Sequence, residues 1–176
     1  MLFQAAFTLA FFGFLRVSEF AAVSRTDPAK KCLALSDVSL HGDLPVLQVR
    51  LGYSKTDQRG ESSVLSLGNA GNSLVYPVAA LCRFLRVRPP GDGPLFIHLD
   101  RSPLTKFQVN QVLKKGLQLK GFPHQSYSTH SFRIGAATSA AANGFSDEEI
   151  QSLGRWRSSA FQRYIRPASL FTASHV

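Results

Sequence analysis

The spacing of apolar residues changes along this 176-residue chain, and that change limits the folds open to it. Residues 2–12 are an almost continuous apolar block of helical length. Residues 33–67 instead contain short alternating stretches, as at 46–51, separated by polar turns. Helical signals return from residue 77 onward. We therefore predict a mixed, mainly α-helical domain with a small three-stranded antiparallel sheet.

Capping residues mark the helix boundaries in the second half of the chain. Thr105, Thr129 and Ser146 are expected N-cap residues, because their hydroxyl groups can accept a hydrogen bond from the first helical turn. The predicted helices cover residues 77–85, 105–119, 130–143 and 146–153, with a last helix that starts at Ser158 or Ser159. Residues 95–99 are expected to form a short strand or an extended segment.

The net charge favours a polyanionic partner. The chain has 20 Lys and Arg against 11 Asp and Glu, a formal net charge of +9 and a pI of about 10.1. Nucleic acid or an anionic membrane face fits this balance, with a generic basic surface as the alternative, and we favour nucleic acid. The helix at 105–119 carries several lysines, and a packed helix with a solvated basic face explains it better than one that reads DNA bases.

Several classes of site are not expected. Cys32 and Cys82 are far apart and fit no disulfide or metal spacing, and the histidines show no ligand pattern. The apolar start of the chain lacks a cationic n-region, and Arg16 and Glu19 interrupt it, so a buried helix is preferred to a signal peptide or membrane span. We predict no metal, no small-molecule cofactor and no membrane segment.

Arg16 introduces a charge into an apolar block, where a charge is costly unless it is paired or functional. Two interpretations remain open. Arg16 can pair with Glu19, one helical turn away, as an ordinary ion pair. Alternatively, Glu19 holds the guanidinium of Arg16 so that it points into a site.

Residues 129–166 contain the groups that suggest chemistry. His130 and Arg133 lie on one helical face, and the planar guanidinium of Arg133 suits a phosphate, because it can bind two oxygens. Tyr164 follows some thirty residues later and is a possible nucleophile. Together these residues point to chemistry on a phosphate.

With these residues in view, the chain resembles the catalytic domain of the tyrosine recombinases, the phage-integrase family, over most of its length. Residues 14–19 look like the first arginine box of that family, and residues 53–56 look like its hairpin lysine. His130-Ser-Phe-Arg133 matches its His-x-x-Arg box, and Leu153-Gly154 with Tyr164-Ile-Arg resembles its closing box. The Gly-Arg-Trp and Tyr-Ile-Arg sequences in this closing part are most similar to the recombinases of eukaryotic mobile elements, including tyrosine-recombinase retrotransposons.

The resemblance implies an activity and roles for these residues. Tyr164 would attack a DNA phosphodiester and form a 3′-phosphotyrosyl link. Arg16 and Arg133 would hold the non-bridging oxygens, His130 would add a hydrogen bond, and Lys55 would protonate the leaving oxygen. It implies double-stranded DNA and further copies of the chain as partners, with no cofactor. It also implies a nuclear location, or a cytoplasmic one if the source is prokaryotic.

The chain departs from the family pattern in two places. Arg155 follows Gly154 where the family has His or Trp, so either Arg155 fills that position or the turn shifts and Trp156 fills it; we favour Trp156. Arg155 and Arg157 are assigned to DNA contact. Residues 1–176 are expected to be the catalytic domain without the N-terminal DNA-clamping domain, which leaves a non-catalytic DNA-binding module as the alternative.

Overall fold

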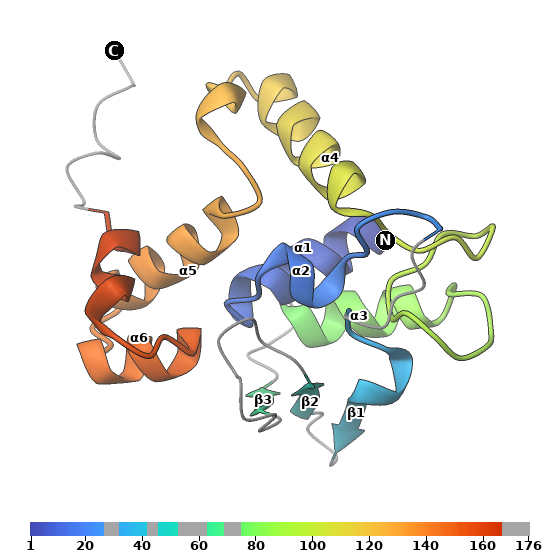
Figure 1. Ribbon diagram of the computed structural model, residues 1–176, viewed down its shortest axis with the longest axis horizontal. Coiled ribbons are helices and arrows are strands. Elements are labelled where there is room, and N and C mark those ends of the chain that lie inside the picture. Colours follow the sequence, from blue (N-terminus) through green and yellow to red (C-terminus); the bar gives the residue numbers. More distant parts are fainter. Residues whose placement is uncertain (27–31, 42–45, 53–62, 69–74, 167–176) are drawn as a thin grey trace.

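The computed structural model describes residues 1–26, 32–41, 46–52, 63–68 and 75–166, and helices make up most of its regular secondary structure (Figure 1). The α-helices are α1 (Leu2–Phe12), α2 (Val17–Phe20), α3 (Pro77–Leu85), α4 (Lys106–Leu119), α5 (Ser131–Ala142) and α6 (Asp147–Gly154). The 3-10 helices are η1 (Leu35–Asp37), η2 (His124–Ser126) and η3 (Ser159–Tyr164). Strands β1 (Val38–His41), β2 (Val46–Leu51) and β3 (Ser63–Leu67) form one antiparallel sheet in the order β1-β2-β3. The predicted fold class is confirmed.

Helix α1 lies at the centre of the molecule, with α3 and α5 packed against it (Figure 1). Its buried residues are Ala5, Ala6, Leu9 and Ala10. Three of these four are alanines, and small side chains let neighbouring helices approach closely. The apolar block at the start of the sequence is therefore a buried helix, as predicted.

The sheet buries one face and exposes the other. Along β2, Leu47, Val49 and Leu51 are buried, and the residues between them are more exposed. Leu65 of β3 pairs with Val49 in the register and extends the buried face. This period of two fixes the register, because a shift by one residue would turn every buried side chain toward solvent.

Among the described residues, two apolar clusters make up the core, and they meet at residues 14 and 15. Leu15 belongs to a cluster with α1, α3 and the sheet. Phe14 belongs to a second cluster, under α5, α6 and η3, which contains Ala136, Ile150 and Phe161. The turn that follows α1 thus connects the two parts of the core.

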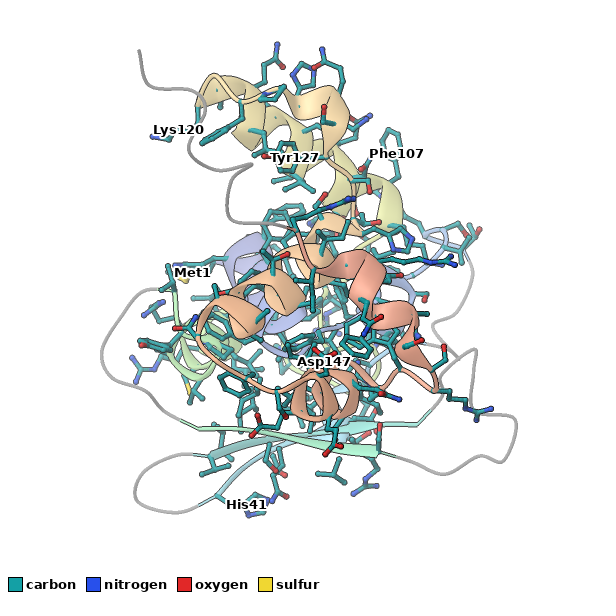
Figure 2. The ribbon with its side chains drawn as sticks, turned by 90° about the vertical axis from the view of Figure 1, so that its left-hand side faces the viewer. Met1, His41, Phe107, Lys120, Tyr127 and Asp147 are labelled. Atoms are coloured by element: carbon teal, nitrogen blue, oxygen red, sulfur yellow. The ribbon has the colours of Figure 1, made fainter. Side chains whose placement is uncertain are left out.

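Helix α4 lies on the opposite side of α1 from the sheet (Figure 1). Figure 2 shows Phe107, Lys120 and Tyr127 at the end of the molecule farthest from His41 of β1. The hydroxyl of Thr105 accepts a hydrogen bond from Gln108 N at 3.3 Å and caps the helix as predicted. Among its residues, α4 buries Val109 alone, so most of its surface is accessible.

The loop after α3 is fixed by Arg88, which is only 8% exposed. Its guanidinium donates to four carbonyl oxygens, those of Leu95, Pro89, Gly91 and Pro94, at 2.8–2.9 Å. Burial lowers the pKa of Arg88.

Three local predictions differ from the structure. The N-cap of α5 is His130 rather than Thr129. Residues 95–99 form neither a strand nor a continuous extended segment: they contain bends and a turn and make only an isolated bridge, Ile97 with Pro103, within the described chain. The segment that carries Tyr164 is a 3-10 helix, in which the hydroxyl of Ser158 accepts a hydrogen bond from Ala160 N at 3.3 Å.

Candidate active site

The turn after α1 presents two backbone carbonyl groups to the site. Gly13 ends α1, and a Cβ at this position would come within 2.8 Å of both Leu65 and the Leu9 carbonyl, so the turn requires glycine. Phe14 has a φ of 50°, in the left-handed region that few non-glycine residues adopt. The carbonyl oxygens of Gly13 and Phe14 both accept hydrogen bonds from arginines that lie more than 100 residues later.

Glu19 holds Arg16 at two points. One carboxylate oxygen accepts a hydrogen bond from the Arg16 backbone N–H at 2.7 Å, and the other lies 3.2 Å from Arg16 Nη1. Glu19 is buried, with its side chain 5% exposed, whereas the Arg16 side chain is 23% exposed. The ion pair of the first interpretation is present and holds the guanidinium of Arg16, and the backbone hydrogen bond holds the start of the residue, while part of the side chain reaches solvent.

Glu19 also pairs with Arg155. Arg155 Nη2 lies 3.3 Å from the Glu19 oxygen that bonds the Arg16 backbone. A buried carboxylate is costly unless charged and hydrogen-bonding partners surround it, and here two guanidinium groups and a backbone N–H do so. Glu19 therefore connects the turn after α1 to the segment that follows α6.

Arg155 is directed into the protein. It caps α6 in the left-handed conformation, with φ 55° and ψ 45°. Its Nη1 donates to the carbonyls of Gly13 at 3.1 Å and Leu153 at 3.2 Å, and its Nη2 donates to that of Phe14 at 3.2 Å. Burial is the main cause of its lowered pKa. The carbonyl and carboxylate partners of Arg155 are interior, whereas Arg157 is exposed. The assignment of both residues to DNA contact stays a prediction.

Arg133, on α5, is the deepest charged group of the site at 1% exposure. Its Nη1 donates to the Phe14 carbonyl, and its Nη2 donates to the Gly154 carbonyl at 2.8 Å. Burial, followed by the nearby charge of Arg16, lowers the pKa of Arg133 to about 10. At neutral pH the guanidinium remains protonated, so the site contains a cation with little hydration of its own.

Trp156 and Tyr164 cover this guanidinium. The Arg133 Cζ atom lies 4.3 Å from the centroid of the Trp156 ring and 5.9 Å from that of the Tyr164 ring. The two rings contact each other, with centroids 5.2 Å apart. Trp156 thus lies between the backbone of Gly154 and its aromatic neighbours, and stacks on Arg133 through a cation–π contact.

The structure brings together some of the candidate residues and leaves others apart. Arg16, Arg133, Trp156 and Tyr164 share one location, the junction of α1, α5 and η3. His130 is exposed and lies one turn before Arg133 on α5. Lys55 and the hairpin around it lie outside the described residues, as does the chain after residue 166.

Thr138 is a contributor that the sequence analysis missed. Its hydroxyl donates to the Tyr164 carbonyl at 3.1 Å and accepts from the Arg166 backbone N–H at 3.1 Å. Both bonds tie the end of η3 to the middle of α5. A hydroxyl within the alanine run of α5 was the signal available in the sequence, since such a group needs a partner when it is turned toward a neighbouring element.

Within the described parts of the chain, no three His, Cys, Asp or Glu side chains are grouped as metal ligands would be. No described helix has the length and apolar character needed to cross a membrane.

The comparison with known sequences supports the resemblance. The chain is 28% identical over 128 residues to an integrase/recombinase XerD homolog from Selenomonas ruminantium, over 69% of this chain and 38% of that protein. A comparison with models of protein families finds no match.

The comparison with solved structures decides the fold. XerH site-specific recombinase, bound to a palindromic difH substrate in a post-cleavage complex, superimposes with a TM-score of 0.68 at 13% identity, over 96% of this chain and 42% of XerH. The chain has the fold of the tyrosine recombinases. XerA recombinase gives 0.61 at 19% identity (97% of this chain, 57% of XerA), and the Tn1549 transposon integrase with circular intermediate DNA gives 0.54 at 15% (96% and 55%).

The resemblance to the tyrosine recombinase family is thereby confirmed, and the finer likeness to eukaryotic mobile elements stays a prediction. The chain spans less than half of the length of the XerD homolog and of XerH.

Proposed function

We propose that this chain cleaves and rejoins double-stranded DNA, with Tyr164 as the nucleophile. The phenolic oxygen of Tyr164 would bond to a backbone phosphorus, and the bond from that phosphorus to the 5′ oxygen would break. The product is a 3′-phosphotyrosyl link and a 5′-hydroxyl, and the reverse reaction rejoins a strand. Other copies of the chain, bound to the same DNA, would cleave the strands with which the first strand is exchanged.

One observation carries the proposal: Arg16 lies more than 100 residues before Arg133 and Tyr164 in the sequence, yet the three residues meet at one place. The Tyr164 ring centroid is 5.9 Å from the Arg133 guanidinium carbon, and the charge of Arg16 is close enough to lower the pKa of Arg133. Phosphoryl transfer requires chiefly such positioning and charge stabilisation.

The remaining steps are assigned to residues around this group. The positive charge of the two arginines would stabilise the negative charge that develops on the phosphate during strand cleavage. His130, one turn before Arg133, is placed to hydrogen-bond a phosphate oxygen or to receive the phenol proton. Lys55 would protonate the 5′ oxygen as it leaves. Arg157 and the lysines of α4 would contact the DNA backbone.

The test is covalent capture. The protein is mixed with nicked suicide duplexes from a randomised library, and covalent protein–DNA adducts are recovered under denaturing conditions. We expect adducts with the wild type and with Tyr76→Phe, a control tyrosine whose ring packs on Phe12. Tyr164→Phe should give none. An adduct that persists in Tyr164→Phe would overturn this choice of nucleophile.

A second candidate function is DNA binding without cleavage, and the burial of Arg133 is the observation that favours it. At 1% exposure, with both terminal nitrogens bonded to carbonyl oxygens, Arg133 already has a complete structural role. Salt-dependent DNA binding by the wild type, with no adduct from any library duplex, would support this candidate instead.

A further inference from the structure

We infer that Arg155 is a positioning residue that sets the two candidate phosphate-binding arginines, Arg16 and Arg133, relative to each other. The inference rests on the proposed function, since it concerns the same site. It assigns a role to the position at which this chain departs from the family pattern of His or Trp. The role is internal: Arg155 acts through Glu19 and through the Phe14 carbonyl rather than on DNA.

The first step of the argument is the reach of the Arg155 guanidinium. It contacts three separate segments: the turn after α1 through Gly13 and Phe14, helix α2 through Glu19, and its own helix α6 through Leu153. A guanidinium is rigid and planar, so several bonds to it fix the relative placement of the groups it binds. Arg155 therefore joins the start of the chain to the segment that leads to Tyr164.

The second step is that two partners of Arg155 are shared with the candidate arginines. The Phe14 carbonyl accepts from both Arg155 and Arg133. Glu19 accepts from both Arg155 and Arg16. A change at Arg155 must therefore alter the surroundings of Arg16 on one side and of Arg133 on the other.

The third step is electrostatic. Three guanidinium groups and one carboxylate meet here, and the charges of Arg16 and Arg155 both lower the pKa of Arg133. Without Arg155, the buried Glu19 would keep only Arg16 as a charged partner among the described contacts. A buried carboxylate that loses one charged partner is costly, so Glu19 would bind the Arg16 guanidinium more closely and hold it away from a phosphate.

The direction of the side chain separates this role from DNA contact. The Arg155 side chain is 16% exposed, and its terminal nitrogens are already bonded to carbonyl and carboxylate oxygens. A phosphate contact would require those bonds to break. Arg155 should therefore influence the rate of strand cleavage and leave the affinity for DNA unchanged.

The experiment compares Arg155→Met and Arg155→Lys with Arg86→Met, which removes one positive charge from an exposed position at the end of α3. Adduct formation is timed with a duplex captured by the wild type, and DNA affinity is measured as a function of salt. We expect Arg155→Met to slow adduct formation by about 100-fold, the size of effect that small misplacement produces. Its DNA affinity and salt slope should equal those of Arg86→Met. The rate of adduct formation by Arg155→Lys should fall between those of Arg155→Met and the wild type. An ammonium group keeps the charge beside Glu19 but cannot bind all of the same partners at once.

A spectroscopic readout keeps the inference independent of catalysis. The side-chain Nε–H signals of Arg16 and Arg133 are recorded in 15N-labelled wild type and in both Arg155 variants. We expect these signals to shift or broaden in the variants and to stay in place in Arg86→Met. If the wild type forms no adduct while the signals still move, the proposed function fails and the positioning role stands. Unchanged signals with an unchanged adduct rate, or a reduced DNA affinity with a shallower salt slope, would overturn the inference.

Discussion

Trp156 packs directly on the backbone of Gly154, in the space that the side chain of any other residue would occupy. A Cβ built on Gly154 would lie 1.5 Å from Trp156 Cζ3. The same ring carries the Arg133 guanidinium 4.3 Å from its centroid and contacts the ring of Tyr164. The position of Trp156 therefore depends on glycine, and the surroundings of Arg133 depend on Trp156.

Gly154→Ala should displace the indole ring and destabilise the protein. Because neither the backbone nor Trp156 can tolerate the contact, we expect a loss of about 1–3 kcal/mol in the free energy of unfolding, typical of overpacking. Urea unfolding followed by tryptophan fluorescence measures both effects, since Trp156 is the single tryptophan of the chain.

Gly116→Ala is the matched control for this substitution. Gly116 lies within α4, and a Cβ there has no neighbour within 4 Å. Replacing it should stabilise the protein by about 0.5–1 kcal/mol, because alanine has the higher helix propensity. Equal effects from the two substitutions would mean that Trp156 does not occupy the space above Gly154.

The contribution of Arg133 to the free energy of unfolding should change with pH in the alkaline range. Burial lowers the pKa of Arg133 to about 10 in the folded protein, below its value in the unfolded chain. The folded state therefore releases this proton first, so the contribution of Arg133 to stability rises as the pH increases above 10 and is lost as the pH falls through 10. We expect the difference in unfolding free energy between wild type and Arg133→Met to shift in favour of the wild type above pH 10. A difference that stays constant or moves the other way would contradict the burial of a charged Arg133.

Thr138→Val should loosen the segment that carries Tyr164. The valine keeps the shape of Thr138 but loses its bonds to the Tyr164 carbonyl and the Arg166 N–H. We expect a loss of about 1–2 kcal/mol in stability and adduct formation slowed by about tenfold, because the nucleophile is held less well. Ser139→Ala, at the adjacent position on α5, should change the stability by less than about 0.5 kcal/mol and leave the rate of adduct formation unchanged. Equal behaviour of the two variants would show that this tether does not position Tyr164.

Arg88→Met should destabilise the loop that follows α3. It would leave the carbonyls of Leu95, Pro89, Gly91 and Pro94 without their donor. A loss of about 2–4 kcal/mol is expected from chemical unfolding, given the cost of unsatisfied buried polar groups. Arg86→Met, two residues earlier and exposed, should change the stability by less than about 0.5 kcal/mol. If Arg88→Met is equally mild, water replaces the guanidinium at these carbonyls.

Local signals in the sequence were enough to predict most of the fold. The apolar block at 2–12, the alternation at 46–51 and the caps Thr105 and Ser146 each determine structure through nearby residues, and the helices and strands formed where they were expected. The 3-10 geometry of Ser159–Tyr164 was not predicted, because the choice between helix types in so short a segment depends on what it packs against.

The candidate site was predictable as a set of residues but not as an arrangement. Arg16, Arg133 and Tyr164 were identified from their residue types and from the resemblance to the family's motifs, both of which are properties of the sequence. The inward direction of Arg155 was not predictable, because it depends on a left-handed backbone at the end of α6 and on carbonyl groups more than 140 residues away. Backbone acceptors leave no trace in a one-letter sequence.

The Phe14 carbonyl is shared by two arginines, and no codon change can delete it, because every amino acid supplies the same oxygen. Amino-acid substitutions can therefore alter these hydrogen bonds only by changing the donors, Arg133 and Arg155, or the backbone conformation of the turn after α1. Chemical synthesis can reach it directly: an ester in place of the peptide link between Phe14 and Leu15 would weaken the oxygen as an acceptor while leaving every side chain intact.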